Sequence, residues 1–82
     1  MARKFVKGYS IEDIKVGMKI QEKDDKKTYC IITNIDDIHA VRGIVYNMNG
    51  IRVGFANYCF DKKCPYEYYG GKIDIINDNK EL

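Results

Sequence analysis

The sequence predicts a mainly β fold: one small five-stranded barrel with one short helical turn near its N-terminus. Three observations predict this class. Apolar and β-branched residues alternate with polar ones at a period of two in several short runs. Charged or glycine-containing turns separate the runs, and no segment keeps a helical period beyond about one turn. Because two-stranded ribbons are marginal alone, short strands must close on one another to share a core.

The elements are predicted in this order. Residues 1–9 form a basic arm, after which Ser10-Ile11-Glu12-Asp13 has the form of a capping box. One helical turn follows at about 11–15 and ends before Gly17. Strands are then expected at 18–22, 28–35, 38–46, 51–58 and 72–76. Residues 59–71, with the single proline, form an irregular loop, and residues 77–82 a flexible tail.

Asn49-Gly50 is the strongest hairpin signal and is typical of a two-residue type I′ turn. Such a turn places Met48 opposite Ile51, Tyr46 opposite Val53, and Ile44 opposite Phe55. These six side chains share one face, because the strand period is two. This face is the predicted core, since the opposite face carries smaller or more polar side chains. The other strands are expected to add Met18, Ile20, Ile31, Ile73 and Ile75 to that core.

The run Ile14-Lys15-Val16-Gly17-Met18-Lys19-Ile20 resembles the start of the first strand in SH3-like and Tudor-type small barrels. The segment from Val41 to Asn57, around Asn49-Gly50, is similar to their central hairpin. The resemblance covers roughly residues 14–76 at the level of architecture, and an OB-like barrel shares some of these features. It implies a domain that binds peptides, nucleic acids or other proteins, among which a fold does not choose. The aromatic cage of Tudor-type domains has no assignable counterpart here.

Composition limits the class of protein. The chain has 82 residues, enough for one domain. Its 14 basic and 12 acidic residues give a net charge of +2, well below that of a dedicated nucleic-acid binder. No apolar run approaches the roughly 18 residues of a membrane span, and no signal-peptide pattern follows the basic N-terminus. Three cysteines, an odd number, favour a reducing compartment, so we expect a cytoplasmic protein.

Few residues suggest chemistry. His39, the only histidine, follows Asp36 and Asp37, but this pattern is more typical of a solvated turn than of a metal site. Cys59 and Cys64 lack the CxxC spacing of zinc or redox sites, although a disulfide between them remains open as an incidental oxidation product. One histidine would have to serve every base role in a catalytic triad. The sequence therefore predicts no catalytic residue, no metal, no cofactor and no enzyme activity.

The segment 58–69 holds five of the ten aromatic residues of the chain. Either these rings cap the thin core of a small barrel, or they form a contact surface, for which tyrosine is well suited. Pro65 stiffens the loop, which favours the second interpretation. The predicted binding residues are Tyr58, Phe60, Lys62, Lys63, Tyr66, Tyr68 and Tyr69.

These observations predict a non-catalytic intracellular module that binds another protein through this loop. A free-standing domain with this Ile-, Lys- and Asn-rich composition also fits an accessory protein of a phage or other mobile element that acts on its host. The first alternative is a nucleic-acid-binding barrel that uses Arg3, Lys4 and Lys7 together with the loop lysines. The second is a homo-oligomer that sequesters a small ligand between chains, because 82 residues hardly enclose a pocket alone.

Overall fold

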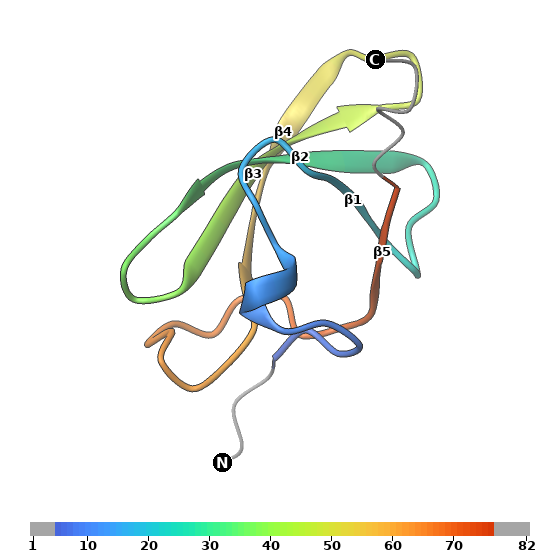
Figure 1. The fold of residues 1–82 in the computed structure, drawn as a ribbon. Coiled ribbons are helices and arrows are strands. Elements are labelled where there is room, and N and C mark those ends of the chain that lie inside the picture. Colours follow the sequence, from blue (N-terminus) through green and yellow to red (C-terminus); the bar gives the residue numbers. More distant parts are fainter. Residues whose placement is uncertain (1–4, 77–82) are drawn as a thin grey trace.

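The computed structural model describes residues 5–76, which form one antiparallel sheet of five strands (Figure 1). A 3-10 turn, η1 (Ile11–Asp13), precedes β1 (Lys19–Glu22), β2 (Thr28–Ile35), β3 (Ala40–Asn47), β4 (Arg52–Cys59) and β5 (Ile73–Ile75). The strand order is β4-β3-β2-β1-β5. The mainly β prediction is confirmed, and each strand lies close to its predicted range. The predicted tail at 77–82, and Arg3 and Lys4 of the predicted arm, lie outside the described residues.

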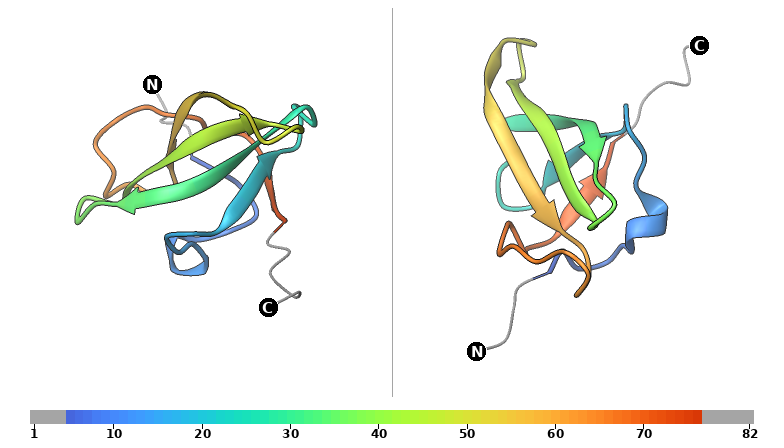
Figure 2. Two further views of the ribbon diagram at one scale, coloured as in Figure 1. Left: turned by 90° about the horizontal axis from the view of Figure 1, so that it is seen from above. Right: turned by 90° about the vertical axis from the view of Figure 1, so that its left-hand side faces the viewer.

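The sheet is strongly bent around its core, as the two views of Figure 2 show. Within residues 5–76 no strand ladder joins β4 to β5, so a closed barrel is not established. Isolated bridges, Lys7 to Lys72 and Tyr58 to Tyr69, lie across this gap. There the Val6 N–H also donates to the Cys59 carbonyl oxygen at 2.7 Å. Val6 is buried, so the arm expected at 1–9 belongs to the fold from residue 5 onward.

The N-terminal turn is shorter than predicted but is held in the predicted way. The Ser10 N–H donates to the Asp13 carboxylate at 2.8 Å, which is the carboxylate half of a capping box. The turn ends at Asp13, because Ile14 is extended (φ −109°, ψ 134°) and its side chain is buried in the core. Gly17 then adopts a φ of 92°, a conformation that favours glycine, and leads into β1.

The core lies on the concave face of the sheet. Its buried members from the strands are Ile20, Cys30, Ile32, Val41, Tyr58 and Ile73, joined by Val6, Ile14 and Phe60. At the centre of this face β3 carries Gly43, which is buried. A Cβ atom there would lie 2.6 Å from the Ile31 carbonyl oxygen, too close for any side chain. The concave side therefore has no room for a side chain at position 43, next to β2.

The β3–β4 hairpin differs from the predicted one in its turn. The Asn47 N–H donates to the Ile51 carbonyl oxygen at 2.9 Å, so the loop has three residues, 48–50. Gly50 has a φ of 81°, whereas Asn49 has no positive φ, so the turn is not type I′. Tyr46 pairs with Arg52, and a bulge at Val53 then restores the predicted pairing of Ile44 with Phe55.

The prediction that this face forms the core is wrong. Phe55 is 74% exposed and Val53 is 56% exposed, while the opposite face, with Val41 and Tyr58, is buried. Alternation shows that a strand has two different faces but does not show which one packs. Here the bend of the sheet decides: the concave side encloses Ile20, Ile32 and Tyr58, and the convex side leaves Phe55 and Val53 exposed.

Gly43→Ala should destabilise the fold by about 1–3 kcal/mol, because the added methyl group must displace the β2 backbone. Gly54→Ala is the matched control in β4, since nothing lies within 4 Å of a Cβ built there. This substitution should leave the free energy of unfolding unchanged or raise it by about 0.5 kcal/mol, because alanine restricts the unfolded chain more than glycine does. Urea denaturation of the two variants tests this, and equal stabilities would contradict the close approach at Gly43.

Candidate binding surface

A set of large apolar side chains covers the convex side of the sheet and the tip of the β3–β4 hairpin. We call it the outer patch: Tyr29, Ile31, Ile44, Tyr46, Met48, Ile51, Val53 and Phe55. Met48 and Ile51 are as exposed as Val53, at 61% and 60%. An apolar surface of this kind, continuous over several strands, is typical of an interaction site.

Strand pairing makes the outer patch continuous. Ile44 lies between Ile31 on one side and Phe55 on the other, so three apolar side chains form a row across β2, β3 and β4. Tyr29 pairs with Tyr46 in the next row, and their rings stack with centroids 5.5 Å apart. The side chain of Lys19, which pairs with Ile31, places its ammonium group 4.8 Å from the centre of the Tyr29 ring.

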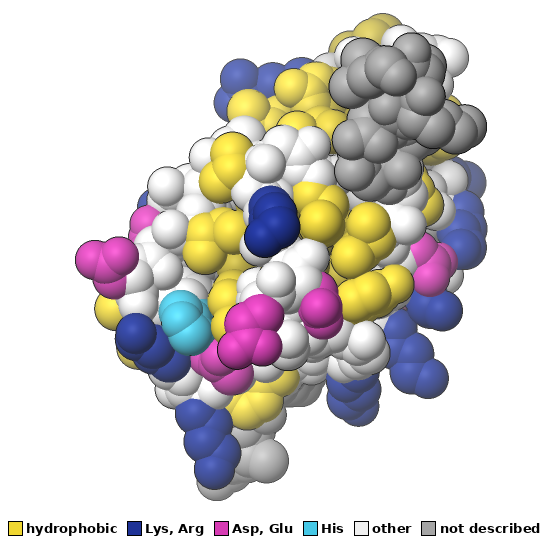
Figure 3. All heavy atoms as spheres, in the orientation of Figure 1, with side chains coloured by type: hydrophobic (Ala, Val, Ile, Leu, Met, Phe, Trp, Pro, Cys, Tyr) yellow, Lys and Arg dark blue, Asp and Glu magenta, His cyan; other side chains and the backbone are white. Residues whose placement is uncertain are grey.

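The charges near the outer patch are positive. β2, β3 and β4 contain no Asp or Glu, whereas β3 carries Arg42 and β4 carries Arg52. The side chain of Arg42 approaches Asp36, in the β2–β3 turn, at 3.8 Å. The face that carries η1 differs, because acidic side chains lie across it and beside the histidine (Figure 3). The central strands therefore present apolar side chains with a basic border.

A shallow hollow of about 320 Å³ opens on this side of the sheet. Its lining includes the ring of Phe55 and the side chain of Ile44, with Arg42 and Arg52 on either side. Thr33 and Asn57 add polar groups. An apolar floor between two guanidinium groups suits an apolar side chain flanked by anionic groups.

The predicted contact loop at 58–69 is mainly a cap. Tyr58 and Phe60 are buried in the core, so their assignment as surface contacts is wrong. Cys59 and Cys64 form with Ala40 a second small core, against which Tyr68 packs. In the part of the chain that the structure describes, the loop covers the Ala40 end of the outer face and leaves the outer patch open.

The remaining loop residues differ in exposure. Tyr69 is half-buried, and its ring meets that of Tyr58 edge to face. Tyr66 is 46% exposed and stacks on Tyr68. Lys62 and Lys63 are exposed, as is Lys7, which follows the residue that bonds to Cys59. The loop therefore brings one exposed tyrosine and two lysines to the surface instead of a platform of aromatic rings.

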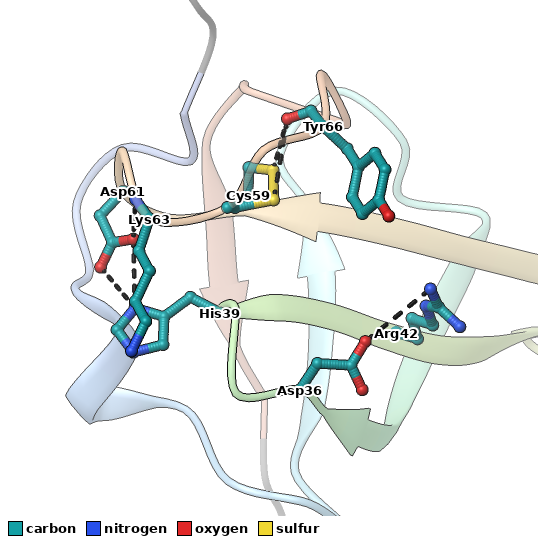
Figure 4. The surroundings of a disulfide bond; sticks show 8 residues. Asp36, His39, Arg42, Cys59, Asp61, Lys63 and Tyr66 are labelled. Carbon is teal, nitrogen blue, oxygen red and sulfur yellow. Dashed lines mark hydrogen bonds and ion pairs between the residues drawn. A yellow bond between two sulfur atoms is a disulfide. The ribbon is translucent and has the colours of Figure 1, made fainter.

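Cys59 and Cys64 are joined by a disulfide, the pairing that the sequence left open (Figure 4). Beside it, His39 occupies the left-handed region at φ 61° and its Nδ1 atom lies 2.9 Å from the Asp61 carboxylate. Asp61 also accepts the Lys63 backbone N–H at 3.0 Å. The histidine thus fixes the loop to the β2–β3 turn. Among residues 5–76 no three His, Cys, Asp or Glu side chains gather as a metal site.

A small polar cluster lies at the inner side of the sheet. The Tyr58 hydroxyl donates to the Glu22 carboxylate at 3.4 Å. Burial, with the nearby Asp24 and Asp25 carboxylates, raises the pKa of Glu22. Burial also raises the pKa of the Cys30 thiol to about 11, so this cysteine is protonated at neutral pH and is a poor nucleophile. The cavity beside them measures about 10 Å³, room for one water at most. The cluster is therefore structural.

Comparison with protein-family models, with curated proteins and with solved structures finds no match to this chain. No helix within residues 5–76 has the length and apolarity needed to cross a membrane. The outer patch is therefore the feature of this chain that bears on its function. The prediction from the sequence included the residues of the outer patch but placed several of them in the core. The lack of acidic residues in β2, β3 and β4 was the signal that would have drawn attention to these strands.

Glu22→Gln should stabilise the protein at pH 7. The pKa of Glu22 is raised on folding, so stability is greatest below its ordinary value of 4.5 and falls as the pH rises through the folded pKa. A neutral glutamine avoids that loss. Asp74→Asn is the opposite control, because hydrogen bonds from Lys23 and Lys26 lower the pKa of Asp74 and its stabilisation is present at neutral pH. Melting curves from pH 3 to pH 8 test this, and a lower melting temperature for Glu22→Gln at pH 7 would contradict it.

Reducing the Cys59–Cys64 disulfide should lower the free energy of unfolding by about 2 kcal/mol. The bond joins residues five apart in sequence, so it closes a small loop and removes little entropy from the unfolded chain. Urea denaturation with and without a phosphine reductant measures the change, and thiol counting under denaturing conditions should rise from one, Cys30, to three. Three thiols before reduction, or identical unfolding curves after it, would refute the prediction.

Proposed function

We propose that this chain is a non-catalytic protein-binding module, an SH3-like small barrel that contacts its partner through the outer patch. The observation that carries the proposal is the exposure of Phe55, Val53, Ile51 and Met48 next to a row of half-buried apolar residues. Covering one such side chain fully contributes about 1.5–3 kcal/mol, so a partner over this patch gains several kcal/mol from apolar burial. The proposal moves the contact from the 58–69 loop to the sheet.

Nucleic acid is less well supported as the partner. Non-specific binding depends on many phosphate contacts, whereas the basic residues that the described strands bring near the outer patch are Lys19, Arg42 and Arg52, with Asp36 close to Arg42. The tyrosines of the patch stack on each other, which leaves less ring surface for bases. Exposed aliphatic side chains at the hairpin tip match a protein surface better than a phosphate backbone.

Sequestration of a small ligand by a homo-oligomer is the other alternative. The hollow on the outer face and a second one, of about 350 Å³ beside Lys7 and Lys72, both open widely to solvent. Binding sites for small molecules usually enclose most of the ligand. A ligand here would need a second chain to cover it, and the outer patch is the surface that such a chain would use.

The cytoplasm remains the proposed location, and an accessory role in a phage or mobile element the proposed context. The odd number of cysteines supports the cytoplasmic location. Both disulfide sulfurs are fully buried, and with Cys59 as a thiol, its sulfur would have the Tyr66 carbonyl oxygen as an acceptor at 2.8 Å. The fold around this pair is therefore compatible with the reduced state.

A Phe55→Ser/Ile51→Ser variant should abolish partner capture while its melting temperature stays within a few degrees of the wild type, because both side chains are exposed. Val16→Ser is the matched control: Val16 is 62% exposed but lies outside the outer patch. Capture from a lysate in high salt, with mass spectrometry of the bound proteins, measures the effect. Proteins retained equally by the double variant would refute the outer patch as the contact surface.

A further inference from the structure

We propose that the partner binds as a short extended segment that adds a strand to the free edge of β4, with an apolar residue flanked by acidic ones. This inference rests on the proposed function, and it names the chemistry of the partner at the same surface. Three features carry it: the unpaired backbone at Phe55, the basic side chains around it, and the open space on both sides of β4.

The edge of β4 is occupied at one end and free at the other. The Asn57 carbonyl oxygen accepts a hydrogen bond from the Tyr69 N–H at 3.2 Å, and the Cys59 carbonyl oxygen accepts one from the Val6 N–H. These oxygens point away from β3. Because backbone groups of alternate residues point the same way along a strand, the N–H and C=O of Phe55 face this edge too. Among the described residues no backbone hydrogen bond reaches them there.

An added strand therefore finds the groups that strand addition needs. Its backbone can exchange two hydrogen bonds with Phe55 and continue towards the hairpin tip, whereas backbone pairing ends before Asn57, because the Tyr69 N–H already bonds to the Asn57 carbonyl oxygen. Side chains on one face of the added strand would lie beside the ring of Phe55. Side chains on its other face would lie beside Gly54, where nothing is within 4 Å of a Cβ position. The edge thus admits a segment of about five residues.

The charges specify the sequence of that segment. Arg52 pairs with Tyr46 and Asn57 pairs with Arg42, so the two arginines lie on the outer face, before and after Phe55 along the strands. Both line the hollow that contains the Phe55 ring. A segment with an acidic residue on each side of an apolar one would place one carboxylate near the Arg52 guanidinium, beside the hairpin tip, and the other where the pairing ends, towards the Arg42 guanidinium. Charge-assisted hydrogen bonds of this kind are stronger than neutral ones.

The same charges argue against a second copy of the chain as the occupant. Pairing β4 with itself would bring the arginines of both copies together, and β2, β3 and β4 have no acidic residue to balance them. A nucleic acid would satisfy the arginines but has no backbone donors and acceptors for strand addition. An acidic, partly apolar peptide satisfies both requirements.

The test uses three five-residue peptides with blocked termini. Each has valine at its centre and threonine on both sides of it, and they differ only in their end residues: aspartate, serine or lysine. We expect the aspartate peptide to shift the amide resonances of β4 and to slow hydrogen exchange at the Phe55 N–H. The lysine peptide should bind about tenfold more weakly or not at all. Arg52→Glu should reverse this order.

Two variants separate backbone pairing from side-chain packing. Phe55→Ala and Phe55→Pro both lose the ring, but only proline also loses the edge-facing N–H. Strand addition predicts that the proline variant binds the aspartate peptide more weakly than the alanine variant. Strand addition would be overturned if the alanine and proline variants bound the aspartate peptide equally and the peptide did not slow hydrogen exchange at the Phe55 N–H of the wild type. The wild-type measurement applies even if the proline variant is poorly folded.

Other results would overturn this inference in favour of another occupant. A twelve-residue oligothymidine that shifts the same resonances when the aspartate peptide does not would indicate a nucleic acid. Slowing of Phe55 exchange with protein concentration alone would indicate a second copy. The proposed function fails separately: it is refuted only when the Phe55→Ser/Ile51→Ser variant retains its captured partner. The peptide result can therefore be negative while the outer patch remains the contact surface.

Discussion

The close approach of β2 and β3 at Gly43 is the contact on which the rest of the structure depends. With no side chain at this position, the two strands curl around Ile32, Cys30 and Tyr58, and the ends of the sheet come near enough for Val6 and Tyr69 to bond across the gap. A thin sheet of short strands gains a shared core only by bending in this way. The bend then divides the side chains by burial: it encloses those of the concave face in the core and leaves those of the convex face at the surface.

That division explains why the protein has an apolar surface at all. The 58–69 loop, held by the Cys59–Cys64 disulfide and by the contact of His39 with Asp61, covers one end of the convex face and forms a second small core. In the described part of the chain no comparable segment lies over the other end. The outer patch is thus the portion of a two-sided sheet that residues 5–76 leave uncovered.

Apolar area, basic charge and a free strand edge meet at Phe55. Each is common on small β proteins by itself. In the proposed complex they act together, because the ligand would supply apolar contact, anionic groups and extended backbone at the same place. The polar cluster of Glu22 and Tyr58 lies on the other side of the sheet, beside a cavity of about 10 Å³, and takes no part in this surface.

The sequence by itself determined the class of fold, the approximate ranges of the strands, the capping box at Ser10 and the pairing of Ile44 with Phe55, since these depend on local patterns of apolar, turn and capping residues. It did not determine which face of the hairpin packs, and so it placed Phe55 and Val53 inside and treated Tyr58 and Phe60 as surface. Alternation is symmetric: it separates two faces and is satisfied equally when either one is buried. Only the tertiary structure decided between them, because the curvature at Gly43 closes the concave side around Tyr58, Phe60 and the other core side chains and leaves Phe55 and Val53 on the convex side.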